Sequence, residues 1–306
     1  MRVCVIIPVY HDWADAQICA DALAAQTRRP DEVIFVNNAP ADPAPAGFRL
    51  PPGGRVLDEA RPGSYAARNR ALDAAGIGTG QEGNGPDASG GAGVIFFTDA
   101  DCTPAPGWIA AGLSVIEGGR APRAMGPVRV TSGEPPNLAE CYDLLTAFRQ
   151  ERNRDRGWSV TANMATRADL FAKVGPFDDR LMSGGDQDWG RRAQAKGFDI
   201  ALDPAMEVAH PARASLSALV RKRRRVEGGK LFQKVEKRGR GRLIAGFLLM
   251  LPFRLLPSIS SSLRLMGAKA PMRVRLGAIW VQYLLRLARV YEYGRILIFA
   301  KTPERR

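Results

Sequence analysis

The sequence predicts an α/β fold, with a mixed, mainly parallel sheet flanked by helices, followed by a basic helical C-terminal extension. Short, almost continuous apolar segments alternate with amphipathic segments, as in sheets that are covered on both faces. The 306 residues are 45% hydrophobic, which is enough for one large core or two modest ones. Residues 1–211 hold 21 Lys and Arg against 27 Asp and Glu, whereas residues 212–306 hold 23 against 4.

The chain begins with a predicted strand, helix and strand. Residues 2–7 (RVCVII) and 32–37 (EVIFVN) are β-branched and apolar, as buried strands are. Residues 13–26 between them place apolar side chains at helical spacing. This order is typical of a parallel sheet.

A second helix and a third strand follow. The helix is predicted over residues 64–76, with Ser64 as its N-cap and Gly76 at its end. Residues 76–93 are rich in glycine and offer little that could be buried, which predicts a flexible surface loop. The strand over 93–97 (GVIFF) then leads toward two aspartates.

The later segments are less regular. Residues 123–132 are predicted to form sheet, 137–154 one helix, and 159–175 a strand followed by a helix. Residues 199–210 are predicted to be a pair of strands ending at a histidine. From about residue 213 the pattern becomes helical, basic and apolar.

The change in composition predicts a domain over residues 1–211 and an extension over 212–306. Within the extension, the apolar stretch of about ten residues inside 243–257 is short of the roughly 20 that a spanning helix needs. The segment 276–300 contains four charged side chains, each disfavoured by roughly 2.5 to 3.5 kcal/mol at a bilayer centre. We therefore expect both segments to lie shallowly in an anionic membrane surface.

Two alternatives for the extension stay open. It can instead be a basic helical subdomain that packs on the first domain. The run RKRRR at 221–225 can also bind nucleic acid, since dense positive charge attracts phosphodiesters. No RNA- or DNA-binding signature accompanies the run, so we expect no nucleic-acid partner.

The four cysteines indicate a reducing compartment. Cys4, Cys19, Cys102 and Cys141 are widely spaced and form no CxxC pair, which predicts free thiols. The first apolar run is broken at Pro8 and is too short for a signal-peptide core. We expect a cytoplasmic protein that is peripheral on the inner face of the cell membrane.

Asp99 and Asp101 form a DxD pair after an apolar strand. Side chains two positions apart in an extended strand project from the same side, so the two carboxylates would repel one another without a cation or a proton. Carboxylate oxygens suit Mg²⁺ or Mn²⁺, which share their coordination with substrate phosphates. The alternative is a solvated turn, in which aspartate is common.

Several motifs in one order carry a family resemblance. They are IIPVYHD, VIFVNNAPAD, GSYAARNRAL, FFTDADCTP, NMATRADLFAKVGPFDDRLMSGGDQDWGRRAQAKGF and VAH. Together, over residues 2–211, they resemble the inverting family 2 glycosyltransferases, which have the Rossmann-like GT-A fold. The resemblance implies a nucleotide-diphosphate sugar donor that binds at the carboxyl ends of the strands.

The resemblance also implies donor-binding residues in the first two strand-end loops. Pro8, Tyr10 and His11 fall where the first loop borders the nucleotide base. Asn37 and Asn38 stand where the family commonly has acidic residues that contact base and ribose. An amide can still pair with a base edge, because it both donates and accepts hydrogen bonds.

Further residues match the donor and metal positions. Arg68 and Asn69 match the family's ARN motif, where a guanidinium binds phosphate or orients the first aspartate. The family pattern assigns Asp99 to the ribose and Asp101 to the metal. His210 stands where many members have a third metal ligand or a phosphate contact.

The segment SGGDQDWGRRA resembles the family's GEDxDLxxR. Asp186 falls on the position of the base, with Asp188 as the second choice, and Gly185 replaces the usual glutamate. Gly185 and Trp189 are expected near the acceptor, where the indole can stack. The alternative is that both aspartates only stabilise the first turn of a helix that runs to Ala195.

The leading hypothesis is a metal-dependent inverting glycosyltransferase. It would move a sugar to a hydroxyl of a glycan or glycolipid acceptor, with Mn²⁺ or Mg²⁺ as cofactor. The other hypothesis is a non-catalytic nucleotide-sugar-binding or membrane-scaffold protein on a decayed transferase fold. Asn37, Asn38 and Gly185 motivate this second hypothesis, because each replaces an expected acid.

Overall fold

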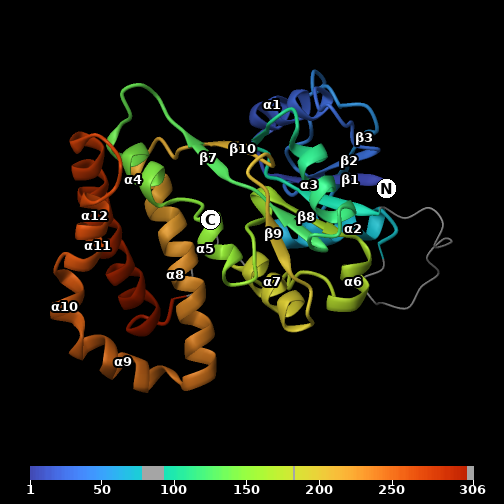
Figure 1. Cartoon of the computed structure of the whole chain (residues 1–306). Coiled ribbons are helices and arrows are strands. Elements are labelled where there is room, and N and C mark those ends of the chain that lie inside the picture. Colours follow the sequence, from blue (N-terminus) through green and yellow to red (C-terminus); the bar gives the residue numbers. More distant parts are fainter. Residues whose placement is uncertain (78–92, 182, 302–306) are drawn as a thin grey trace. The chain divides into compact units, whose positions relative to one another are not determined.

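The computed structural model describes residues 1–77, 93–181 and 183–301 (Figure 1). It divides the chain into two compact units, each built from two segments. Unit 1 comprises Met1–Arg129 and Phe148–His210, and unit 2 comprises Val130–Ala147 and the chain from Pro211 onward. The predicted flexible loop at 76–93 falls almost wholly on residues 78–92, which lie outside the described residues.

A seven-stranded sheet forms the centre of unit 1. Its order is β3-β2-β1-β4-β8-β6-β9. The strands are β1 (Val3–Val9), β2 (Glu32–Asn37), β3 (Gly54–Asp58), β4 (Val94–Phe97), β6 (Arg123–Met125), β8 (Met164–Arg167) and β9 (Ile200–Leu202). Strand β8 is antiparallel to both of its neighbours, and the other pairs are parallel. The predicted mixed, mainly parallel sheet is confirmed.

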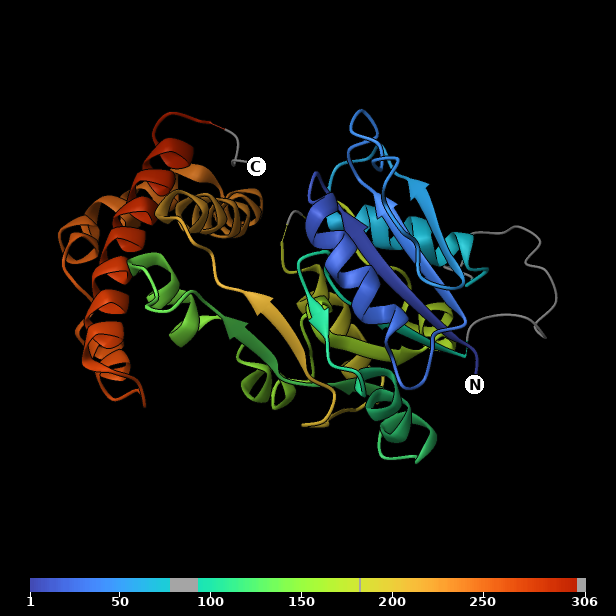
Figure 2. The ribbon, with the colours of Figure 1, turned by 90° about the horizontal axis from the view of Figure 1, so that it is seen from above.

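The side chains of β1 point alternately into two hydrophobic cores, because successive residues of a strand face opposite sides. Val5 and Ile7 join one core beneath α1 (Trp13–Ala24) and α3 (Trp108–Glu117). Cys4 and Ile6 join the other core. That second core lies beneath α2 (Ser64–Ala74), α6 (Asp169–Val174) and α7 (Gly185–Ala195). Figure 2 shows strands and helices of unit 1 from above.

The boundaries of α2 differ from the prediction at one end. The N-cap residue is Gly63, with φ 116°, and no side chain caps the helix. Ser64 is instead the first helical residue, so its predicted capping role is wrong. Gly76 ends the helix as predicted, with φ 71°, a backbone conformation that glycine adopts without strain.

A small second sheet has the order β5-β10-β7. Its strands are β5 (Thr103–Pro104), β7 (Val128–Thr131) and β10 (Val208–Pro211). The predicted pair of strands at 199–210 exists as β9 and β10, but they belong to different sheets. The predicted sheet over 123–132 divides in the same way into β6 and β7. Gly126 lies at that division, where a Cβ atom would meet the carbonyl oxygen of Met206 at 1.7 Å.

The predicted helix over 137–154 is two helices. They are α4 (Leu138–Thr146) and α5 (Gln150–Arg154). Phe148 interrupts them with φ 48°, which is unusual for a bulky residue. Helix α4 therefore belongs to unit 2, although the sequence placed it in the first domain. Whether residues 212–306 form a separate domain stays a prediction.

Unit 2 is helical throughout its described core. Beside α4 it contains α8 (Leu216–Arg238), α9 (Arg240–Leu249), α10 (Leu251–Leu255), α11 (Ile259–Met266) and α12 (Met272–Leu297). The long helix α12 packs against α4 and α8 and buries Ala278, Val281 and Leu285. Segment 276–300 is thus partly core, and only its outer face is exposed.

No single helix in the described parts of the chain is long and apolar enough to cross a membrane. One pair of segments, Arg240–Leu249 and Leu251–Met266, meets the length and composition criteria together, but it is bent by 67°.

Candidate active site

Asp99 and Asp101 lie in a turn that follows β4, at the carboxyl edge of the parallel strands. The amide of Cys102 donates to the carbonyl oxygen of Asp99 at 3.0 Å, so the chain reverses between the two acids. The expected extended geometry of the pair is therefore wrong, and the alternative of a turn after the strand describes the backbone. The two carboxylates instead meet different partners, which separates the roles that they can have.

Arg68 holds Asp99. Arg68 lies on α2, is 2% exposed, and donates through Nη2 to Asp99 Oδ1 at 2.5 Å. The ring of Tyr65 lies 5.7 Å from the guanidinium, and Arg68 Nε has no hydrogen-bond partner among the described residues. A buried guanidinium requires an anion. The geometry agrees with the predicted orienting role of Arg68, and its contact with phosphate stays a prediction.

His210 lies beside Asp101 because of the strand register. Strand β10 pairs antiparallel to β5, with Ala209 opposite Thr103. This register places His210 next to the turn, where its Nε2 is 3.2 Å from Asp101 Oδ2. The imidazole is buried, and the ring of Phe148 packs 4.6 Å from it. The structure thus brings together the two residues that were predicted to hold the metal.

Cys102 adds a third potential ligand atom. The ligand atoms of Asp101, Cys102 and His210 lie within 4.8 Å of one another. Burial raises the pKa of the Cys102 thiol well above its usual value, and the charges of Asp99 and Asp101 add to this effect. A neutral thiol is a weaker ligand than the carboxylate and the imidazole beside it, which form the better donor pair. Such a set suits Mn²⁺ better than Mg²⁺, which prefers oxygen ligands alone.

Asp12 increases the negative charge of this region. It precedes α1, in the loop after β1. Partial burial raises the pKa of Asp12, and the negative charge of Asp101 raises it further. A region that already disfavours ionised carboxylates gains stability from a bound cation.

The end of β1 and the loop after it carry three predicted donor residues. Pro8 lies within β1, opposite Val36 of β2. His11 adopts φ 62°, and its Nδ1 lies 2.7 Å from Asp42 Oδ2 in the loop after β2. The exposed ring of Tyr10 packs edge-on against His11 at 4.1 Å. The structure therefore gathers this loop at the strand ends, and the contacts with the base stay predictions.

The two asparagines after β2 are buried and bonded to the chain. Asn38 donates through Nδ2 to the carbonyl oxygens of Glu59 and Arg61, at 2.8 and 2.7 Å. Asn37 donates to the carbonyl oxygen of Asp42 at 3.3 Å and accepts from a nearby amide. Both hydrogens of the Asn38 amide are used, so a base cannot receive one from it. A contact of Asn38 with the donor would have to use its amide oxygen, and it stays a prediction.

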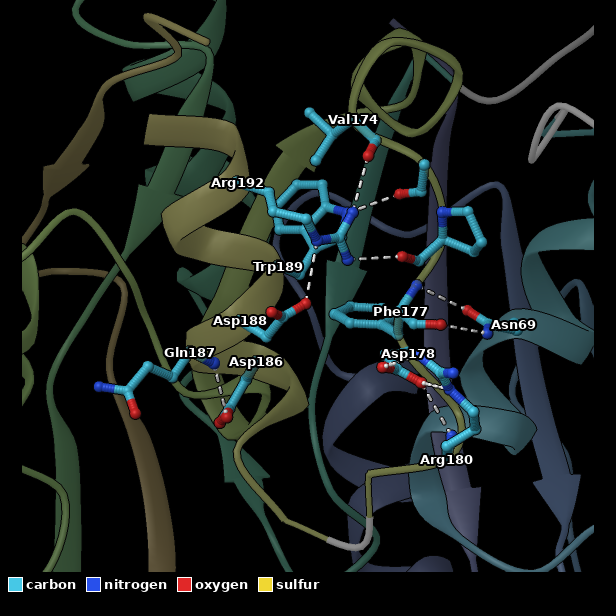
Figure 3. Close-up of polar contacts among 12 residues, drawn as sticks. Asn69, Val174, Phe177, Asp178, Arg180, Asp186, Gln187, Asp188, Trp189 and Arg192 are labelled. Atoms are coloured by element: carbon cyan, nitrogen blue, oxygen red, sulfur yellow. Dashed lines mark hydrogen bonds and ion pairs between the residues drawn. The ribbon is translucent and has the colours of Figure 1, made fainter. Parts of the chain in front are cut away.

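Asn69 is likewise used within the protein. It donates to the carbonyl oxygen of Phe177 at 2.8 Å and accepts from the amide of Phe177 at 3.1 Å. Figure 3 shows this reciprocal pair, which fixes the segment that leads toward α7. Both ends of the Asn69 amide thus hold the backbone, and its contact with the donor stays a prediction.

Asp186 lies in the first turn of α7. Its Oδ1 accepts from the amide of Gln187 at 2.8 Å and from the hydroxyl of Tyr65 at 3.3 Å. Desolvation by burial raises the pKa of Asp186, and these hydrogen bonds and the charge of Arg68 only partly oppose that shift. A carboxylate with a raised pKa is a stronger base than an exposed one, as general-base catalysis requires.

Gly185 is required by its surroundings. A Cβ atom at this position would lie 2.7 Å from the ring of Tyr65. The missing glutamate of the family pattern is thus explained by packing. Gly185 is buried, and its place near the acceptor stays a prediction.

Asp188 and Trp189 have structural partners (Figure 3). Asp188 accepts from Arg192 at 2.9 Å, and Arg192 also donates to two carbonyl oxygens of residues 174–176. Trp189 is fully buried, stacks on Phe171 and donates to a backbone carbonyl at 2.9 Å. The expectation that Trp189 stacks on the acceptor is wrong. The ion pair of Asp188 makes Asp186 the better candidate base.

Tyr65 is the site residue that the sequence reasoning missed. It touches Gly185 and Asp186 and lies beside Arg68. A signal was present, because residues three positions apart share a face of a helix. Tyr65 therefore had to face the same side as Arg68.

The fold and the site together define the class of glycosyltransferases with the GT-A fold. A family model described as glycosyl transferase family 2 matches residues 4–173. The glycosyltransferase AglE of Haloferax volcanii is 31% identical over 237 residues, which cover 75% of this chain and 73% of AglE. The chain belongs to glycosyl transferase family 2. It is an inverting enzyme that uses a nucleotide-sugar donor.

Solved structures share the fold. The mannosyltransferase PcManGT from Pyrobaculum calidifontis, in complex with GDP-Man and Mn²⁺, aligns with a TM-score of 0.50 and 16% identity, over 98% of this chain and 74% of that one. Residues 1–349 of S. aureus TarS, in complex with UDP-GlcNAc, align with a TM-score of 0.51 and 14% identity, over 98% and 91%. Identities this low establish the GT-A fold alone.

Proposed function

We propose that this enzyme is a metal-dependent glycosyltransferase that moves a sugar from a nucleotide diphosphate to a hydroxyl of a glycan or glycolipid. The observation that carries the proposal is the pairing of Asp101 with His210 at 3.2 Å, at the edge where the parallel strands end. The Mn²⁺ and nucleotide sugar held by PcManGT, a protein of the same fold, also support it.

Asp101 and His210 would hold the ion, and the buried imidazole makes Mn²⁺ the better candidate. When bound, a divalent cation neutralises charge on the departing diphosphate as a Lewis acid. Arg68 keeps Asp99 in one orientation, so that the carboxylate is positioned for the donor ribose. The partnerless Nε of Arg68 gives further support for an anionic ligand nearby.

Asp186 is proposed as the base. It would take the proton of the acceptor hydroxyl as that oxygen attacks the anomeric carbon, while the bond from that carbon to the diphosphate breaks. The raised pKa of Asp186 favours the protonated product of this step. Tyr65 would orient the carboxylate through its hydroxyl.

A panel of nucleotide sugars with Mn²⁺ tests the proposal. Transfer and donor hydrolysis are measured for the wild type and for the Asp101→Asn and Asp186→Asn variants. Asp155→Asn is the matched control, because Asp155 is exposed and pairs with the adjacent Arg154. Loss of activity in both site variants, with the control unchanged, is expected. Full activity in both would contradict the assigned roles, and donor binding without turnover would support the decayed-transferase hypothesis.

The location of the enzyme is also a proposal. We infer that it acts on the cytoplasmic side of the cell membrane, as a peripheral protein with a lipid-linked or glycan acceptor. The support is the charge of residues 212–306, where 23 basic residues stand against 4 acidic ones. Anionic headgroups attract such a surface at about 1 kcal/mol per basic residue.

A further inference from the structure

The most apolar exposed surface of the described chain lies on one short part of unit 2. Nine large apolar side chains within residues 248–266 are between 36% and 75% exposed. We call this segment the apolar ledge. Its exposed residues are Leu248, Leu249, Met250, Phe253, Leu255, Leu256, Ile259, Leu263 and Met266. Soluble surfaces rarely gather so many, and such patches mark interaction sites.

The ledge differs from α12, which the sequence grouped with it as a membrane-facing segment. Helix α12 buries eight residues, whereas α9, α10 and α11 together bury only Phe247 and Leu265. Helix α12 also exposes large apolar side chains such as Trp280, but within 248–266 Leu265 alone is buried, so the ledge contributes little to the core of unit 2. It needs an apolar phase to cover it.

The charge around the ledge identifies that phase. Residues 239–291 contain nine Lys and Arg and no Asp or Glu. Several of these arginines donate hydrogen bonds to main-chain carbonyl oxygens and not to carboxylates, so these bonds do not neutralise their positive charge. Arg286 donates to the carbonyl oxygens of Phe253 and Arg254, and Arg275 donates to that of Met266. These hydrogen bonds connect the ledge to α12, and the arginines that make them place positive charge beside it.

We propose that the apolar ledge inserts into one leaflet of an anionic lipid bilayer, with α12 remaining packed in unit 2. Leucine, isoleucine and phenylalanine side chains would enter the acyl region, and the arginines would bind headgroup phosphates. The 67° bend within 240–266 means that the segment is not one straight spanning helix, which fits insertion into a single leaflet. The inference deepens the proposed membrane location and does not depend on catalysis.

Two other occupants fit less well. A second copy of the chain would bring two surfaces without acidic residues face to face, which repel one another. Nucleic acid complements the charge, but leucine and isoleucine offer no ring on which bases could stack. An anionic bilayer complements both the charge and the apolar side chains.

Vesicle binding of the full chain tests the proposal. Flotation is measured with phosphatidylcholine vesicles that contain about one third phosphatidylglycerol, at low and high salt. The triple variant Leu249→Ser, Phe253→Ser and Ile259→Ser is expected to bind about tenfold more weakly or worse. Ile18→Ser is the matched control, because Ile18 is an exposed isoleucine in unit 1. It should bind like the wild type.

A depth probe makes the result independent of charge alone. The four native thiols are buried, so a cysteine introduced by Ile259→Cys can be labelled selectively with an environment-sensitive fluorophore. The label is expected to shift to the blue with anionic vesicles, whereas a label at Ile18→Cys is not. An unshifted label at position 259, or equal binding of the triple variant, overturns insertion. Insertion is also overturned if the wild type does not bind vesicles but self-associates or binds RNA, and the triple variant loses that interaction.

These readouts separate the two proposals. Vesicle binding and the fluorescence shift are measured without donor or acceptor, so a failure of catalysis leaves them unchanged. Circular dichroism of the triple variant, compared with that of the wild type, shows that the fold is retained, since the substituted side chains are exposed.

Discussion

Replacing Tyr65 by phenylalanine should weaken catalysis by changing the ionisation of Asp186. The ring fills the space beside Gly185, and the substitution keeps that ring. Only the hydroxyl is lost, together with its 3.3 Å hydrogen bond to Asp186 Oδ1. The change therefore separates the polar role of Tyr65 from its packing.

The magnitude follows from the hydrogen bond. A bond to a charged group contributes about 1.5 to 3 kcal/mol, and one of 3.3 Å belongs at the low end. About 1.4 kcal/mol corresponds to a factor of ten in a protonation equilibrium. Burial already raises the pKa of Asp186, and the tyrosine hydroxyl opposes that shift because it stabilises the carboxylate. Its removal must therefore raise the pKa further.

The assay is kcat/KM as a function of pH, whose acid limb reports the base of the free enzyme. In Tyr65→Phe the limb should move to higher pH, and on that limb the activity should fall by up to about tenfold. Tyr293→Phe is the matched control, since Tyr293 also donates to a carboxylate at 3.3 Å but lies in unit 2. An unmoved limb in Tyr65→Phe, with Asp186→Asn inactive, would refute the coupling.

The other predictions concern stability, measured as thermal unfolding midpoints. The folded protein raises the pKa of Asp186, so ionisation of this carboxyl costs stability as pH rises above its unfolded pKa. Asp186→Asn should therefore be more stable than the wild type at pH 7 and about equally stable near pH 3. A clear loss at pH 7 would assign Asp186 a structural role. Asp188→Asn should be less stable, because it removes the carboxylate that pairs with the partly buried Arg192, which bonds to two backbone carbonyl oxygens. Asn69→Ala should lose about 2 to 4 kcal/mol, since it leaves a buried amide and a buried carbonyl unpaired, and a change confined to the KM for the donor would contradict this reasoning. Gly185→Ala should lose about 1 to 3 kcal/mol through overpacking, and an unchanged midpoint would show that the tyrosine ring can move.

The central strands could be predicted because their apolar sequences indicate that they are buried. Strands β1 and β4 are apolar along their whole length and β2 is apolar between its two end residues, since both faces of the sheet are covered. Strands β3 and β5 were missed for the opposite reason. One is half-exposed and the other has two residues, so neither shows a pattern. The break at Phe148 was also invisible, because helical spacing continues across it.

The acidic residues of the site could be predicted from the sequence, but the residues that surround them could not. Asp101 and Asp186 stand in recognisable motifs, and the structure supplies a partner for each. The pairing of Asp101 with His210 depends on the β5–β10 register, which joins segments more than 100 residues apart. The sequence also cannot show which polar side chains form hydrogen bonds with main-chain groups. Asn38 and Asn69 looked available for a ligand, yet carbonyl and amide groups use them.

Helix α2 connects the two chemical halves of the site. One turn of it carries Arg68, which holds Asp99 on the donor side, and Tyr65, which holds Asp186. The two side chains also contact one another, with the guanidinium 5.7 Å from the ring. A displacement of α2 would therefore change the donor carboxylate and the base together. This coupling gives a physical reason for burying Arg68, although a surface arginine would cost less desolvation free energy. A buried side chain is held rigidly by its neighbours, so Arg68 and Tyr65 together can keep both carboxylates in fixed positions.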